Sequence, residues 1–219
     1  MVGLLSVNAG KPGYLGERRG TMVESGIRKR PVPEGMIAVS TTNLAGDEQA
    51  DLHNHGGPEK AVYAYPSEHL PLWGAEFKPD TPFGPGSFGE NLSTSGWLES
   101  QTFIGDVWQW GDVVLQVCQP RFPCYKLGMA TGFPRVVKAM VANGRTGWYL
   151  RVLEPGQAPV GGPINLVERG ENRVTVSGCH IARLPGASFD VIERAASAPA
   201  LASGLRQGFL ELLETRIIR

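Results

Sequence analysis

The sequence predicts a mainly β protein whose strands form a closed or partly closed barrel, followed by a small helical extension. Glycine occurs 29 times and proline 17 times in 219 residues, and they separate short apolar runs such as MIAVS, AVYAY, DVVLQVCQ and NRVTVSG. These runs are irregularly spaced and do not alternate with long helices, which favours a barrel over a doubly wound sheet. After about residue 174 short blocks of Ala, Leu and Arg take over, so we divide the chain into a β domain at 1–173 and a three-helix extension at 174–219.

Two helices are expected to interrupt the β domain, at residues 66–77 and 133–144, and Gly144 is suited to end the second. In the extension, Thr175 can cap a helix through Leu184 and Ser188 a second one through Ala196. A third helix is expected from Ser203 to about residue 216, with apolar residues at helical spacing. The three short helices are expected to pack together and against the β domain.

The charge balance excludes a strong global field. Lysine and arginine total 21, as do aspartate and glutamate, so nothing draws the chain as a whole to a nucleic acid polymer or an anionic membrane. No apolar stretch approaches the roughly 18 residues of a membrane span, and the apolar start is too short for a signal peptide. The odd number of cysteines, three, predicts no disulfide framework, and we expect a cytoplasmic protein in a reducing compartment.

Two motifs are weak. GPGSFG, residues 84–89, has the spacing of a dinucleotide-binding loop, but turn-like residues stand on both sides where a strand and a helix are required. His53 and His55 would share one face of a strand and could bind a metal, but the sequence offers no third ligand, and His69 and His180 fall in expected helices. A tight glycine turn or a polar loop at the mouth of a pocket are the other interpretations of the histidine pair.

CQPRFPCYKLG, residues 118–128, is the most informative segment. Cys118 ends an alternating strand, where it acts as a small buried apolar residue. Cys124 follows Pro123, which stiffens the loop, and lies near Arg121 and Lys126, whose charges favour the thiolate. A thiolate attacks electrophiles and binds soft metals, so a functional cysteine and a structural loop cysteine both remain open.

Four segments in fixed order resemble the MOSC domain, the molybdenum cofactor sulfurase C-terminal domain, in its YiiM-like branch. They are GDEQADLHNHGGPEKAVYAYPSEHLPLW, FGENLSTSGWLES, GDVWQWGDVVLQVCQPRFPCYKLG and GRTGWYLRVLEPG. The similarity extends from about residue 25 to 168, and the helical extension also resembles that branch. The resemblance implies a barrel-like fold that binds the molybdenum cofactor, molybdopterin, with Cys124 as the protein ligand to molybdenum.

The resemblance also implies reduction of small N-hydroxylated compounds, such as hydroxylaminopurine-type bases and hydroxylamines, to amines. For the anionic part of the cofactor we choose Lys29, Arg121 and Lys126, because such cations pair with phosphate. The remaining motif positions are expected to line the pocket around pterin or substrate: His55, Glu90, Asn91 and Gln119. Glu90 and His55 are both candidate proton donors.

The sequence has no cysteine cluster and no credible flavin or nicotinamide motif, so a separate reductase is expected to supply electrons. One alternative is a non-enzymatic carrier of molybdenum cofactor or sulfur on Cys124, and another is a metal-free enzyme with Cys124 as nucleophile. A plain interaction module would leave the cysteine segment unexplained. For the helical extension, gating the pocket, forming a homodimer contact and recruiting the electron donor stay open.

Overall fold

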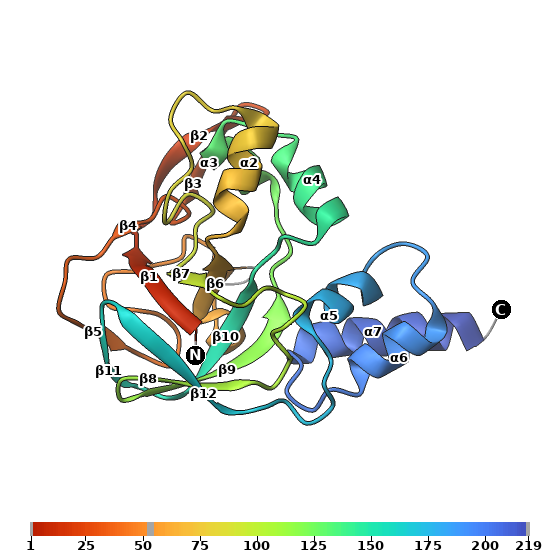
Figure 1. Ribbon diagram of the computed structural model, residues 1–219. Helices are drawn as coiled ribbons and strands as arrows, with labels where there is room; N and C mark the ends of the chain where they lie inside the picture. Colours follow the sequence, from red (N-terminus) through yellow and green to blue (C-terminus); the bar gives the residue numbers. More distant parts are fainter. Residues whose placement is uncertain (1, 52–54, 218–219) are drawn as a thin grey trace.

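The computed structural model describes residues 2–51 and 55–217, and its body is a β-barrel with a few helices around it (Figure 1). The strands follow the order β12-β8-β9-β10-β6-β7-β1-β4, and β12 pairs with β1 to close the barrel. Val2 of β1 lies opposite Ile164 of β12 at this closure. The strands are β1 Val2–Ala9, β4 Arg30–Pro31, β6 Val62–Pro66, β7 Leu92–Ser95, β8 Val107–Trp110, β9 Val113–Pro120, β10 Trp148–Glu154 and β12 Gly162–Glu168. The predicted mainly β class is confirmed.

Strand pairing in the barrel is antiparallel except between β6 and β7, which run parallel. Two further pairs lie outside the barrel sheet: β2 Gly13–Arg18 with β3 Thr21–Ser25, and β5 Met36–Val39 with β11 Gly156–Pro159. In β10, Tyr149 lies opposite Tyr63 of β6 on one side and Gln119 of β9 on the other. This register brings three motif segments that are far apart in the sequence to one end of the barrel.

The two helices expected within the β domain are present. α2 spans His69–Phe77 and α4 spans Val136–Asn143. Gly144 ends α4 with a φ of 72°, and its N–H bonds to the carbonyl of Met140, which is the glycine cap predicted from the sequence.

The structure adds one helix and removes one expected strand. Cys124, expected on a stiff loop, is the residue before a short helix, α3, at Tyr125–Thr131, so Lys126 is helical. Cys124 itself has extended φ and ψ, as a residue that precedes a helix does. The prolines before it favour a loop, so no sign of a helix is visible in the sequence at this point. The run NRVTVSG forms no strand: Thr175 makes one isolated bridge to Phe103, and the chain then turns into a helix.

The C-terminal helices are α5 Val176–Ala182, α6 Phe189–Ala196 and α7 Ser203–Ile217. Thr175 caps α5 as predicted, since its side chain accepts a hydrogen bond from the N–H of Gly178 at 2.9 Å. Ser188 is the residue before α6, also as expected, although its side chain makes no capping bond. In Figure 1 these helices lie together on one side of the barrel.

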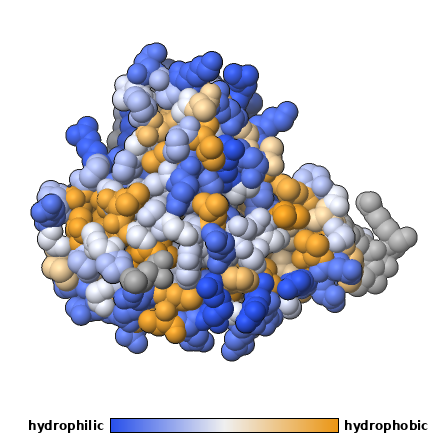
Figure 2. Space-filling view, in the orientation of Figure 1, coloured by the Kyte–Doolittle hydropathy of each residue, from blue (hydrophilic) through white to orange (hydrophobic). Residues whose placement is uncertain are grey.

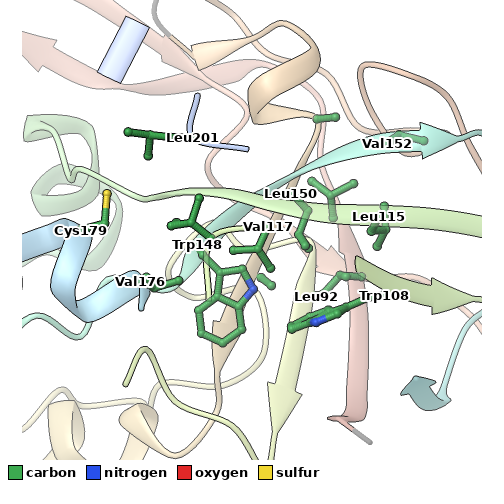
Figure 3. Packing of buried hydrophobic residues seen from close by; sticks show 14 of the residues in the cluster. Leu92, Trp108, Leu115, Val117, Trp148, Leu150, Val152, Val176, Cys179 and Leu201 are labelled. Atoms are coloured by element: carbon green, nitrogen blue, oxygen red, sulfur yellow. The ribbon is translucent and has the colours of Figure 1, made fainter. Parts of the chain in front are cut away.

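The helices and the barrel share one hydrophobic core, as Figure 3 shows. Trp148 of β10 and Val117 of β9 are fully buried beside residues of the helical region, among them Val176, Cys179 and Leu201. Further along, Phe209 and Leu213 of α7 belong to the same cluster. Apolar burial of this kind stabilises the attachment, so α5–α7 cannot separate from the barrel without exposing its core.

The surface carries no single dominant character. On the face shown in Figure 2, hydrophobic residues form separate patches between hydrophilic ones. Within the described ranges, no helix is both long and apolar enough to span a bilayer.

Candidate functional site

A cleft opens beside β6, just past the end of β9 and at the start of β10. Tyr63, Arg121 and Tyr149 contribute to its inner wall. Six of the eight residues chosen from the sequence line it: Lys29, His55, Asn91, Arg121, Cys124 and Lys126. The other two, Glu90 and Gln119, do not.

Cys124 presents a partly buried thiol to this cleft. Its Sγ lies 3.7 Å from Nε2 of His55, a contact that joins two segments far apart in the sequence. Burial by itself would raise the pKa of the thiol, but the His55 ring, the backbone N–H of Lys126 and the charge of Arg121 outweigh it and lower the pKa to about 7. The lowered pKa favours the thiolate, the form that binds soft metals and attacks electrophiles.

Arg121 places a positive charge under the cleft. Its side chain is only 5% exposed, and its guanidinium lies over the Tyr63 ring, 4.9 Å from the ring centre. Nη1 donates to the Tyr63 hydroxyl at 3.4 Å, and within residues 2–51 and 55–217 Arg121 has no ion pair with a carboxylate. A buried cation without a carboxylate partner is costly, so this position suits a negative charge in the cleft, from the Cys124 thiolate or from an anionic ligand.

Lys29 already has a counter-ion. Its ammonium pairs with the buried carboxylate of Asp47, and burial is the main reason why the pKa of Lys29 is lowered. The same carboxylate accepts hydrogen bonds from the Gly10 N–H and the Asn91 amide, each at 2.9 Å. Lys29 therefore brings less net charge to the cleft than its position in the sequence suggests.

The Asn91 side chain is held at both ends. Its Oδ1 accepts from the Tyr63 N–H at 3.0 Å, and its Nδ2 donates to Asp47 and to the carbonyl of Asn8. With these groups engaged, Asn91 shapes the cleft wall, and its predicted contact with a cofactor stays a prediction.

Glu90 is fully buried behind the cleft and organises its own loop. The carboxylate accepts hydrogen bonds from the N–H groups of Gly86 and Phe88, at 2.7 and 3.0 Å, and from the Ser93 hydroxyl at 2.9 Å. Burial raises its pKa. The G-x-G-x-x-G segment thus folds around a carboxylate of this chain, with its N–H groups occupied. The role of Glu90 as a proton donor stays a prediction, because its buried carboxylate does not line the cleft.

Gln119 faces another cavity, which lies against α7. Its Nε2 donates to the backbone carbonyl of Glu59 at 3.0 Å. Its predicted contact with pterin stays a prediction, while the observed bond ties β9 to the segment that follows His55. Phe122, three residues after Gln119, lines both this cavity and the cleft that holds Cys124.

The histidine pair is described only in part, because His53 lies outside the described residues. His55 lines the cleft and faces Cys124. Across the described positions, no group of three or more His, Cys, Asp or Glu side chains is arranged to hold a metal ion. The structure thus gives His55 a place beside the thiol.

Three of the cleft residues that the sequence did not single out are of chemical interest. Tyr63 and Tyr149 face each other across β6 and β10 with their ring centres 5.3 Å apart, and burial raises the pKa of both hydroxyls. Lys60 also lines the cleft. The signal was available, because each tyrosine stands inside one of the quoted motifs at an alternating strand position. Only the strand register shows that the two meet.

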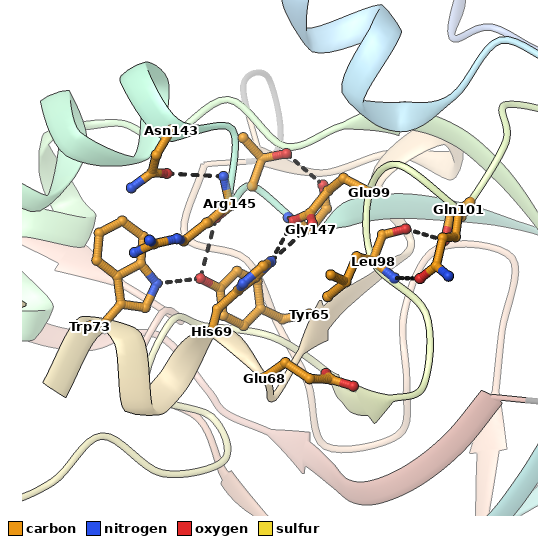
Figure 4. Close-up of polar contacts among 12 residues, drawn as sticks. Tyr65, Glu68, His69, Trp73, Leu98, Glu99, Gln101, Asn143, Arg145 and Gly147 are labelled. Carbon is orange, nitrogen blue, oxygen red and sulfur yellow. Dashed lines mark hydrogen bonds and ion pairs between the residues drawn. The ribbon is translucent and has the colours of Figure 1, made fainter. Parts of the chain in front are cut away.

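A second polar network joins α2 to the segment just before β10 (Figure 4). Nε2 of His69, from α2, contacts both carboxylate oxygens of Glu99 at 3.1 and 2.9 Å, and Oε1 of Glu99 accepts from the Gly147 N–H at 2.7 Å. The carbonyl of Gly147 in turn accepts from the N–H of Arg121 at 3.3 Å. At φ 61° a Cβ on residue 147 would lie 2.4 Å from the carbonyl oxygen of Ala64, so only glycine fits. This network fixes the backbone from which Arg121 reaches the cleft.

Comparison with known proteins agrees with this architecture. The chain is 41% identical over 209 residues to YflK of Bacillus subtilis strain 168, described as uncharacterized, and the match covers 95% of this chain and 93% of YflK. A protein of Gibberella moniliformis called "Reductase" is 40% identical over 170 residues, which are 76% of this chain but 29% of that protein. The crystal structure of YiiM from Geobacillus stearothermophilus superposes with a TM-score of 0.80 at 32% identity, covering 97% of this chain and 100% of that one.

One family matches the central part of the chain, which holds strands β6 to β10 of the barrel and part of the cleft lining. The MOSC domain family matches residues 51–165, the stretch that carries His55, Arg121 and Cys124. The resemblance stated from the four motifs is therefore confirmed. This chain belongs to the MOSC domain family.

Proposed function

We propose that the protein binds the molybdenum cofactor through Cys124 and reduces N-hydroxylated compounds, such as hydroxylaminopurine-type bases and hydroxylamines, to amines. The observation that carries the proposal is the pairing, in one cleft, of a thiol of lowered pKa with a buried guanidinium that has no carboxylate partner among the described residues. Membership of the MOSC family, which is associated with the molybdenum cofactor, supports the same assignment.

The residues present fit the cofactor in their chemistry. A thiolate is a soft ligand suited to a metal that is already bound by sulfur, and Cys124 is the one partly exposed cysteine, since Cys118 and Cys179 are buried. Arg121 offers a fixed charge for the anionic part, and Lys126 adds a second cation at the mouth. Lys29 contributes less, because Asp47 neutralises it.

When bound, the cofactor supplies two-electron redox chemistry. The overall reaction is R–NHOH + 2 e⁻ + 2 H⁺ → R–NH₂ + H₂O, so the N–O bond breaks and two protons must be delivered. His55 faces Cys124 within the cleft, which supports its proposed role as the residue that holds a proton for the reaction. The paired tyrosines give the cleft an aromatic wall against which a flat base can pack.

The electrons come, in this proposal, from a separate reductase. The Gibberella relative called "Reductase" matches this chain over less than a third of its own length, and its name supports reductive chemistry for a protein that contains such a module. The cleft mouth is open to solvent, so a donor can approach it.

The first experiment measures molybdenum and pterin per chain after expression in a host that makes the cofactor. We expect near-stoichiometric metal in the wild type and in Cys118→Ala, and only background metal in Cys124→Ala. Metal that is unchanged in Cys124→Ala would exclude Cys124 as the ligand. No metal in any of the three proteins would favour a metal-free cysteine enzyme.

The second experiment supplies a chemically reduced viologen as electron donor and follows conversion of a hydroxylaminopurine base to the amine by chromatography. Turnover by the metal-loaded wild type and none by Cys124→Ala is the expected result. Stable metal without turnover would instead favour the carrier function.

A further inference from the structure

Glu59 contacts several elements of the fold, and the proposed function gives it no role. It lies in the short 3-10 helix Pro58–Lys60, four residues after His55 and directly before Lys60. His55 and Lys60 line the cleft, whereas the Glu59 side chain points away from it and is one-third exposed.

The carboxylate of Glu59 holds the start of α7. Oε1 and Oε2 accept from the backbone N–H of Ser203 at 2.9 and 3.1 Å, and Oε2 accepts from the Ser203 hydroxyl at 3.0 Å. Oε1 also pairs with Nη2 of Arg151 in β10 at 2.9 Å. A charged acceptor at the first N–H groups of a long helix is favourable, so this carboxylate serves as an external cap for α7.

The backbone of Glu59 is bound as firmly as its side chain. Its carbonyl accepts from Nε2 of Gln119 at 3.0 Å and from Sγ of Cys118 at 3.2 Å. Cys118 returns a bond to the helical region, because its own carbonyl accepts from the N–H of Ala202 at 2.9 Å. One residue therefore joins β9, β10 and the start of α7 to the wall of the cleft.

The partners of Glu59 are themselves held in place. Phe209 and Leu213 of α7 are buried in the core that the barrel shares, so the helix gives Glu59 a rigid attachment point. On the other wall, Phe122 stacks on His180 of α5, with ring centres 6.2 Å apart. The helical region thus touches both segments that form the site.

We propose that Glu59 is a positioning residue: it holds the cleft wall that carries His55 and Lys60 in register with Cys124, and it does so by attaching that wall to α7. The helical extension is then part of the site's support. The inference rests on the proposed function only in taking the Cys124 cleft as the site, and it is independent of the substrate.

The test is a double-mutant cycle on the reactivity of Cys124 in the full-length chain, purified from a host that lacks the cofactor. Iodoacetamide labelling at pH 7 is followed by mass spectrometry for Glu59→Ala, His55→Ala and the double variant. If Glu59 acts through His55, Glu59→Ala slows labelling about three- to tenfold and adds nothing in the His55→Ala background, because coupled positions are not additive.

Glu76→Ala is the matched control. Glu76 also pairs with an arginine, at 3.5 Å to Nη1 of Arg145, and is similarly exposed, but it lies on α2 away from the cleft lining. Its labelling rate is expected to equal that of the wild type. A merely structural loss would slow labelling equally in both backgrounds and would overturn the proposal, as would a Glu59→Ala rate that is unchanged or higher.

Glu59→Gln keeps the test decisive where Glu59→Ala fails to fold. It retains one oxygen for Ser203 and loses the charge, so we expect a smaller slowing that again vanishes in the His55→Ala background. Additive effects in this series overturn the proposal. Because the readout needs neither metal nor substrate, its failure is distinguishable from failure of the proposed function, which the metal content of Cys124→Ala decides.

Discussion

Two sulfurs six residues apart show how differently one segment can treat the same chemical group. Cys118, at the end of β9, is fully buried, and desolvation raises its pKa to about 12. Cys124 lies past the end of that strand, where His55, the Lys126 N–H and Arg121 outweigh burial and lower the pKa to about 7. Burial alone makes a cysteine inert, whereas partial burial beside donors and a cation makes it reactive.

The largest expected effect is selective labelling. At pH 8 about nine-tenths of a thiol with a pKa of 7 is ionised, against about one part in 10⁴ for a pKa of 12, so iodoacetamide should modify Cys124 about 10³- to 10⁴-fold faster than Cys118. Peptide mapping after brief labelling of the folded chain measures the ratio. Comparable labelling of both cysteines would contradict the difference in thiol pKa. Labelling in urea, where both cysteines are exposed and react, serves as the control.

The pH profile sharpens the same contrast. Because only the thiolate reacts, the Cys124 rate should fall about tenfold per pH unit below 7 and level off above it. In His55→Ala the midpoint should move up toward the ordinary value of about 8.5, lowering the rate at pH 7 several-fold. An unchanged midpoint would show that the 3.7 Å contact between Sγ and His55 does not stabilise the thiolate.

For the free energy of unfolding, the larger effect is expected at Cys118 and the smaller one at Cys124. Cys118→Ala leaves a small cavity in the core and frees the carbonyls of Glu59 and Tyr149, so we expect a loss of about 1–2 kcal/mol. Cys124→Ala, at a partly exposed position, should change the free energy of unfolding by less than about 0.5 kcal/mol. Urea unfolding of both variants beside the wild type decides this, and equal losses would contradict the proposed division between core and cleft.

Local patterns in the sequence were enough for several features of the fold. Gly144 at the end of α4 and Thr175 at the start of α5 were predicted because a cap depends on a few neighbouring residues. The helix α3 and the absence of a strand at NRVTVSG were not predicted, because short apolar runs and proline-rich segments are compatible with more than one local structure.

In the candidate site, too, some features follow from the local sequence and others only from the tertiary structure. The sequence by itself determined that Cys124 stands on a stiff, cation-flanked segment and that the motifs are those of a MOSC domain, since residue types and spacing are local properties. Only the tertiary structure decided that Lys29 is neutralised by Asp47, that Glu90 is sealed in its own loop, and that His55 reaches the sulfur. Charge pairing, burial and register arise between segments far apart in the chain, and these interactions set the pKa and accessibility on which chemistry depends.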